Sequence, residues 1–121
     1  MAISTYPMDF SFTDTLFEGD KDGYVDFLSI SIDEFESDFP KLKLALEDKD
    51  SDLFSAVKHK FSTRLHTFNL DTLERFMAEV GANYKEDVNS VDPVMAWAEL
   101  ERHLRNILDT LNEKLSEIKN S

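Results

Sequence analysis

The sequence predicts an all-α fold, an up-down four-helix bundle with a short extra helix at its N-terminal end. Four long segments repeat apolar residues at three- and four-residue steps, and no segment alternates with a period of two between hairpin turns. With 41% hydrophobic residues, 3 Gly and 3 Pro, the composition is that of a packed chain with few loops. The 121 residues suit one domain, which we expect at residues 10–119 after a lead-in at 1–9.

The N-terminal third predicts a short helix followed by a long one. Residues 9–17 carry four apolar side chains after the helix-breaking Pro7. A polar break at residues 19–23 separates them from a periodic stretch that starts at Tyr24 and continues to residue 39. Pro40 falls where a helix kinks or restarts, and the apolar stripe then continues to about Glu47.

Helix-capping residues delimit the remaining helices. Asp50 or Ser51 can cap a helix that runs to about Thr67, and Asn69 tolerates the left-handed conformation that ends helices. We expect Asp71 to cap the next helix, which ends near residue 81 before a polar loop at 82–90. An Asp followed by Pro at residues 92–93 is a strong start signal for a last, long helix.

Composition excludes several classes of function. The chain has no Cys, which removes disulfides, Cys-ligated zinc and thiol nucleophiles. We expect no membrane span, because no apolar run approaches the roughly 18 residues that a span needs, and no signal-peptide pattern is visible. We therefore expect a cytoplasmic protein. A net charge of −12 repels nucleic acid and anionic membranes, so neither is an expected partner.

The stretch at residues 54–73 is the most informative part of the chain. On a helical wheel its apolar residues share one face, and His59 lies on the opposite face from Phe61. No Asp or Glu occurs between Leu53 and Leu70, whereas Lys58, Lys60 and Arg64 do. His59 therefore sits in a basic island on an acidic protein, on the solvent side of a well-anchored helix.

This stretch resembles the motif of histidine-containing phosphotransfer (HPt) domains, H-x-L-K-G-S-x-x-x-L-G-x-x-x-L. His59 matches the histidine, and the apolar positions match Phe61, Phe68 and Leu73. The upstream segment is similar to the family's first long helix with its mid-helix Pro, and the resemblance covers roughly residues 10–112. The predicted four-helix fold agrees with that of the family.

The chain departs from the motif just after the histidine. Ser62 replaces the usual Lys, Thr63 the usual small residue and Asn69 the later Gly. Since Lys60 and Lys58 flank His59 at about 100° on either side, we expect them to approach a phosphoryl group instead. The Ser62 and Thr63 hydroxyl groups can hydrogen-bond a phosphoryl oxygen.

The resemblance implies a phosphocarrier of a two-component phosphorelay. His59 would accept a phosphoryl group from a receiver-domain aspartate and pass it to another receiver, and a hybrid histidine kinase would be a further partner. Such a protein is a stoichiometric carrier and not an enzyme, with no cofactor or metal of its own, because the receiver holds the divalent metal. Residues outside the core stripe are candidates for receiver docking: Phe10, Phe12, Phe17, Ile30, Arg64 and His66.

Two alternative interpretations of the function stay open. An HPt-like module that binds receivers or kinases without carrying phosphate would explain the missing lysine. Residues 18–29 imitate a calcium loop, but Ser29 stands where that loop needs a bidentate Glu, so we expect a capped acidic turn. The remaining histidines, His66 and His103, are expected at the surface.

Overall fold

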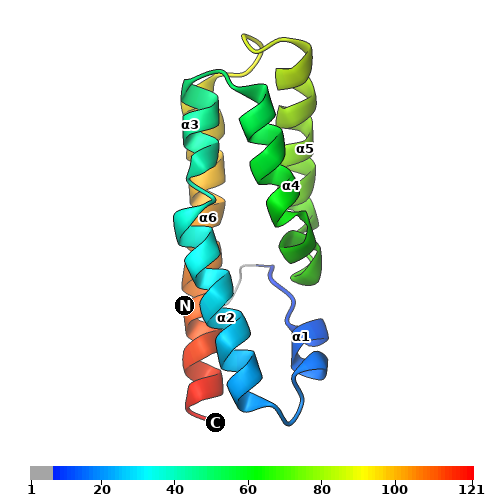
Figure 1. The fold of residues 1–121 in the computed structure, drawn as a ribbon, viewed down its shortest axis with the longest axis vertical. Helices are drawn as coiled ribbons and strands as arrows, with labels where there is room; N and C mark the ends of the chain where they lie inside the picture. Colours follow the sequence, from blue (N-terminus) through cyan, green and yellow to red (C-terminus); the bar gives the residue numbers. More distant parts are fainter. Residues whose placement is uncertain (1–6) are drawn as a thin grey trace.

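A computed structural model describes residues 7–121, and six α-helices and no strands occupy them (Figure 1). The bounds are α1 Ser11–Leu16, α2 Lys21–Ser37, α3 Lys41–Glu47, α4 Ser51–Thr67, α5 Asp71–Glu86 and α6 Pro93–Lys119. The predicted all-α helical bundle with a short N-terminal helix is therefore confirmed. Part of the expected lead-in, residues 1–6, lies outside the described residues.

The long helix α6 is the axis of the molecule. In Figure 1, α2 and α3 follow one another along α6, while α4 and α5 lie side by side in the upper half. The helix α1 lies below the end of α4, beside the lower part of α2. The upper half is thus a four-helix bundle, and α2 and α6 continue below it.

A break at Pro40 divides the first long segment into two helices. The helix α2 begins at Lys21, earlier than expected, because the Asp20 side chain caps it by accepting a hydrogen bond from the Gly23 backbone N–H at 3.0 Å. The acidic turn before α2 is therefore a helix cap, as expected. A new helix then starts directly after Pro40, which agrees with the predicted restart.

The caps of α4 and α6 are as predicted, and that of α5 is not. Asp50 accepts a hydrogen bond from the Leu53 N–H at 3.0 Å, and Asp92 accepts one from the Val94 N–H at 3.0 Å. Asn69 has a φ of 58°, the left-handed conformation expected after α4. Asp71, however, is the first residue inside α5. Leu70 holds the cap position and makes no side-chain cap hydrogen bond, so the prediction that Asp71 caps α5 is wrong.

The helix α5 also runs past Gly81, where the sequence predicted its end, to Glu86. Tyr84 accounts for the extra turn, because its ring is 1% exposed and its hydroxyl donates to the Ala45 and Leu46 carbonyls of α3. This anchor outweighs the cost of about 1 kcal/mol that a mid-helix Gly imposes relative to Ala. The loop between α5 and α6 is correspondingly shorter than predicted.

The core forms one continuous cluster along the bundle. Within it, the Phe61 ring of α4 lies 4.9 Å from the Phe35 ring and 5.4 Å from the Phe39 ring, centroid to centroid. These three rings are fully buried. They join α4 to α2 and to the start of α3, and this packing sets the rotation of α4 about its axis.

Candidate functional site

His59 lies near the middle of α4 on its solvent face and is exposed. The opposite face carries the buried residues Phe54, Val57, Phe61 and Leu65, of which Phe61 is 0% exposed. The helix phase inferred from the sequence is therefore confirmed. A partner can reach the His59 imidazole without any rearrangement of the core.

Short side chains surround His59 along its face of the helix. The positions three and four residues away are Ser55, Ala56, Ser62 and Thr63, which lie next to a residue on a helix surface. The Ser62 hydroxyl donates a hydrogen bond of 2.9 Å to the His59 backbone carbonyl, so it turns toward the helix. The His59 imidazole therefore extends beyond these neighbouring side chains, which leaves room for the surface of another protein.

Lys60 points toward the junction of α2 and α3. Its ammonium group forms an ion pair with Asp38, to which the Lys41 ammonium also pairs at 3.2 Å. The hydrogen bond from Lys60, with that from Lys41, lowers the pKa of the Asp38 carboxyl. The same hydrogen bond raises the pKa of Lys60. Lys60 is thus charged and already paired.

Arg64 links α4 to α2 through its side-chain contacts. Its guanidinium donates to Glu34 Oε1 at 3.0 Å and to the Ser31 hydroxyl at 2.6 Å, and it lies 5.2 Å from the centre of the Phe27 ring. Ser31 is fully buried and in turn donates to the Phe27 backbone carbonyl. The Arg64 side chain is 18% exposed, so this cation holds two helices together more than it offers charge to a partner.

The Lys58 side chain extends from the other side of α4, toward α5. It is half-buried, and its aliphatic stem passes over Gly81: a Cβ atom at Gly81 would lie 3.7 Å from Lys58 Cε and 3.8 Å from Cδ. The three cations of the basic island therefore diverge, two toward α2 and α3 and one toward α5.

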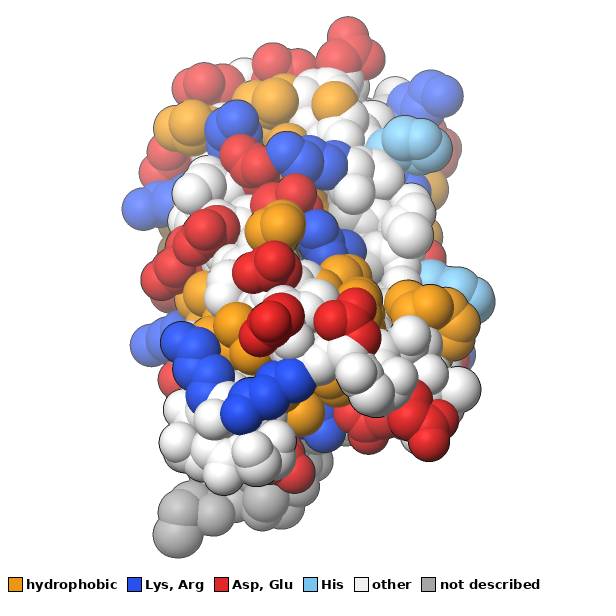
Figure 2. All heavy atoms as spheres, turned by 60° about the horizontal axis from the view of Figure 1, so that its bottom comes forward, with side chains coloured by type: hydrophobic (Ala, Val, Ile, Leu, Met, Phe, Trp, Pro, Cys, Tyr) orange, Lys and Arg blue, Asp and Glu red, His pale blue; other side chains and the backbone are white. Residues whose placement is uncertain are grey.

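His66 is exposed on the same face of α4 as His59, seven residues or about 10 Å further along the axis. Figure 2 shows histidine side chains at the right-hand edge of the face viewed, next to exposed hydrophobic surface. At that separation the two imidazoles cannot share one metal ion. Throughout residues 7–121, no group of three or more His, Asp or Glu side chains is placed to hold a metal.

The apolar residues predicted for receiver docking fall into two groups, exposed and half-buried. Phe12 is 61% exposed and Ile30 is 52% exposed. Phe10 instead packs edge-on against Phe68, with ring centroids 5.5 Å apart, and Phe17 stacks on Tyr24. These two half-buried rings join α1 to the rest of the protein. An exposed side chain that the sequence did not single out is Leu16, 60% exposed, which shares a face of α1 with Phe12 four residues earlier.

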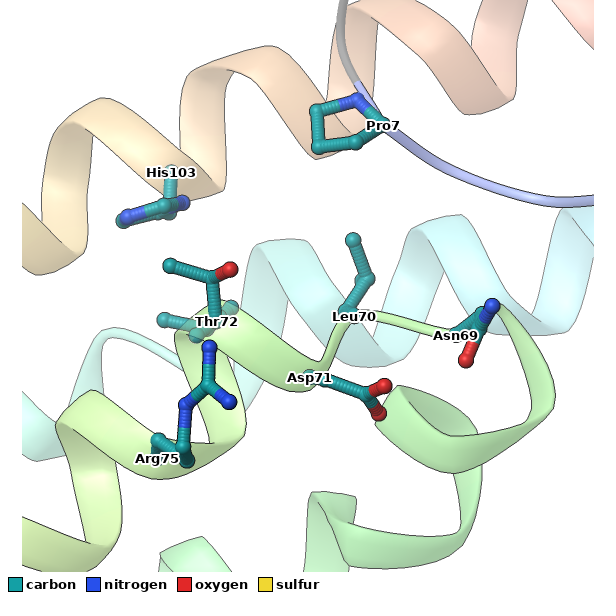
Figure 3. Close-up of a pocket in the computed structure, with 8 residues that line it drawn as sticks. Pro7, Asn69, Leu70, Asp71, Thr72, Arg75 and His103 are labelled. Carbon is teal, nitrogen blue, oxygen red and sulfur yellow. The ribbon is translucent and has the colours of Figure 1, made fainter.

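His103 is buried, 8% exposed, and the expectation of a surface residue is wrong. It lines a pocket of about 280 Å³ between α6 and the turn before α5, opposite Thr72 and Arg75 (Figure 3). Its Nε2 atom lies 3.3 Å from Glu99 Oε2. Burial, together with the Arg102 charge, lowers the pKa of His103 despite Glu99.

Comparisons with known proteins give no identification. No protein-family model, curated protein or solved structure matches the chain. In the described part of the chain, no helix is long and apolar enough to cross a membrane.

The exposed position of His59 follows from the sequence pattern, whereas the interhelical contacts around it do not. The pairing of Lys60 with Asp38 and of Arg64 with Glu34 joins residues 22 and 30 positions apart in the sequence. No local spacing signals such pairs. The lone mid-helix Gly81 was a usable signal, because a Gly inside a helix often marks close packing against a neighbour.

Proposed function

We propose that the protein is a histidine phosphocarrier of a two-component phosphorelay, with His59 as the phosphoacceptor. The observation that carries the proposal is the exposed His59 at the centre of α4, in an HPt-like motif whose apolar positions face the core. The short side chains around His59, which leave its imidazole accessible, also support it. The carrier would work in the cytoplasm between receiver domains and a hybrid histidine kinase.

The reaction requires an unprotonated ring nitrogen on the exposed imidazole of His59. The unprotonated ring nitrogen forms an N–P bond with an aspartyl phosphate while the O–P bond to the receiver breaks and its carboxylate is released. Charge balances without loss of a proton, since the product is a phosphorylated imidazolium. The receiver's divalent metal and lysine would supply most of the transition-state stabilisation, so this protein is a carrier and not an enzyme.

Docking on a receiver needs apolar surface near the histidine. Phe12 of α1 and Ile30 of α2 expose apolar side chains, and His66 is exposed on the same face of α4 as His59. Phe10, Phe17 and Arg64 would contribute indirectly, because Phe10 packs against Phe68 at the end of α4, Phe17 packs against α2, and Arg64 links α4 to α2. Ser62 and Thr63 would lie under the incoming phosphoryl group.

Transfer of labelled phosphate from a phosphorylated receiver tests the proposal. We expect the protein to acquire phosphate that is labile in acid and stable in base, as a phosphohistidine is. The variant His59→Gln should acquire none, whereas Lys119→Met, a change of an exposed residue at the C-terminal end of α6, should acquire as much as the wild type. Equal labelling of His59→Gln and wild type would refute the assignment.

The second candidate function is a receiver- or kinase-binding module that carries no phosphate. The absence of a lysine three residues after His59 favours it, since Ser62 there donates its hydroxyl to the helix backbone. This function predicts that receiver binding survives His59→Ala and that no receiver labels the wild type. Labelling of the wild type by any receiver would eliminate it.

A further inference from the structure

The three cations near His59 differ in what already neutralises them. Arg64 is paired with Glu34 and bonded to Ser31, and most of its side chain is buried. Lys60 shares Asp38 with Lys41. A phosphoryl group on His59 would have to compete with these carboxylates for either cation.

No carboxylate of the described residues is paired with Lys58, so a phosphoryl group on His59 would not have to compete for it. Among residues 7–121 its ammonium group makes no ion pair and no side-chain hydrogen bond. It is adjacent to His59 in the sequence, and its Cα lies about 100° around the helix from that of His59. The four-carbon stem is long and flexible enough to move from its place beside Gly81 and carry the ammonium across that arc to a group on His59.

Gly81 provides the surface on which that stem lies. Its missing side chain leaves α5 flat beside Lys58 Cδ and Cε, and a Cβ there would already be in van der Waals contact with them. A larger side chain at this position would push the lysine stem aside. Gly81 therefore leaves open the space along which the Lys58 stem passes over α5.

We propose that Lys58, and not Lys60 or Arg64, is the cation that pairs with the phosphoryl group on His59. This inference rests on the proposed function. Lys58 would replace the lysine that the motif places three residues after the histidine. It would attract the incoming dianion and stabilise the phosphorylated imidazole, while Lys60 and Arg64 hold α4 in place.

Phosphoramidate tests this pairing without a receiver. The unprotonated His59 nitrogen forms an N–P bond, the P–N bond of phosphoramidate breaks, and ammonia leaves with its electron pair. The variant Lys58→Met keeps the stem and removes the charge. We expect its phosphorylation rate to fall about fivefold, the effect of one unit charge about 4 Å from the group in water. Lys60→Met and the distant, exposed Lys119→Met should each stay within about twofold of the wild type.

Two further measurements separate charge from structure. Lys58→Arg retains the cation and should restore most of the rate, while melting temperatures of Lys58→Met and Lys58→Arg should match. The rate difference between wild type and Lys58→Met should shrink at 1 M salt, where the Debye length is about 3 Å. If Lys58→Met proves unstable, Lys58→Gln takes its place in the same comparison.

The possible results distinguish this inference from the function on which it rests. If neither phosphoramidate nor a receiver labels the wild type at His59, the proposed function fails. If the wild type is labelled and Lys58→Met reacts as fast, or if Lys60→Met is the slower variant, the phosphocarrier stands and the assignment of Lys58 is overturned.

Discussion

Burial distinguishes the three histidines, although all three lie on helices at positions that looked solvent-facing. His59 and His66 are exposed on α4, while His103 lies between α6 and the start of α5. Only the first two are accessible to a partner. The third is a structural group whose protonation state depends on whether the chain is folded.

His103 should make the stability of the protein depend on pH. Burial lowers the pKa of His103 in the folded protein below its ordinary value of 6.5, so the unfolded chain binds the proton more readily. The contribution of this group is therefore complete above about pH 6.5, and the free energy of unfolding falls as the pH drops from there toward the folded pKa. Urea denaturation of the wild type between pH 7.5 and 5.5 measures this slope.

The matched variant for that titration is His103→Gln, which cannot take up the proton. We expect a smaller slope in this pH window, whatever the change in absolute stability. Parallel curves for wild type and His103→Gln would contradict the linkage.

Phe61 tests the phase of α4 directly. The substitution Phe61→Ala removes a fully buried ring that contacts Phe35 and Phe39, and should cost about 3–5 kcal/mol in the free energy of unfolding. Phe12→Ala, at a ring that is 61% exposed, should change it by less than about 1 kcal/mol. Chemical denaturation compares the two, and similar losses would mean that α4 is rotated from its assigned position.

At the scale of elements, the bounds of the helices depend on both local caps and distant contacts. The starts of α4 and α6 follow from Asp50 and Asp92, whose side chains bond backbone groups within three residues. The end of α5 instead depends on Tyr84 and its bonds to α3. A window of sequence around Gly81 contains no sign of that contact.

Tyr84→Phe should therefore loosen the end of α5. The change keeps the ring and removes the hydroxyl that serves two buried carbonyls, so we expect a loss of about 1 kcal/mol in the free energy of unfolding. Amide hydrogen exchange should become faster in residues 82–86 in particular. Uniformly faster exchange along α4, α5 and α6 would argue against a local anchor.

At the scale of the whole molecule, Lys114 of α6 fastens α1 to the rest of the protein. Its ammonium lies 3.0 Å from Asp14 of α1 and 5.1 Å from the centre of the Phe10 ring. Tyr24 of α2 completes the arrangement by donating its hydroxyl hydrogen to Asp14 at 2.6 Å. Three helices thus meet at one largely buried cation, whose side chain is 13% exposed.

Lys114→Met should release α1 and leave the bundle intact. We expect hydrogen exchange in residues 11–16 to accelerate about tenfold or more, because a partly buried ion pair and a cation–π contact are lost. Exchange in α4 and α5 should not change. Lys119→Met, at an exposed residue of the same helix, serves as the control, and equal behaviour of the two variants would contradict this role of Lys114.

The helical class, the phase of α4 and the exposed position of His59 can all be predicted from the sequence, because periodicity and caps are properties of neighbouring residues. Tertiary structure decided the length of α5, the burial of His103 and the pairing of Lys60 with Asp38. Those features depend on which helices meet and at what register, and contacts between residues far apart in the chain set both. The basic island is therefore visible in the sequence, whereas the one unpaired cation within it, Lys58, is visible only in the fold.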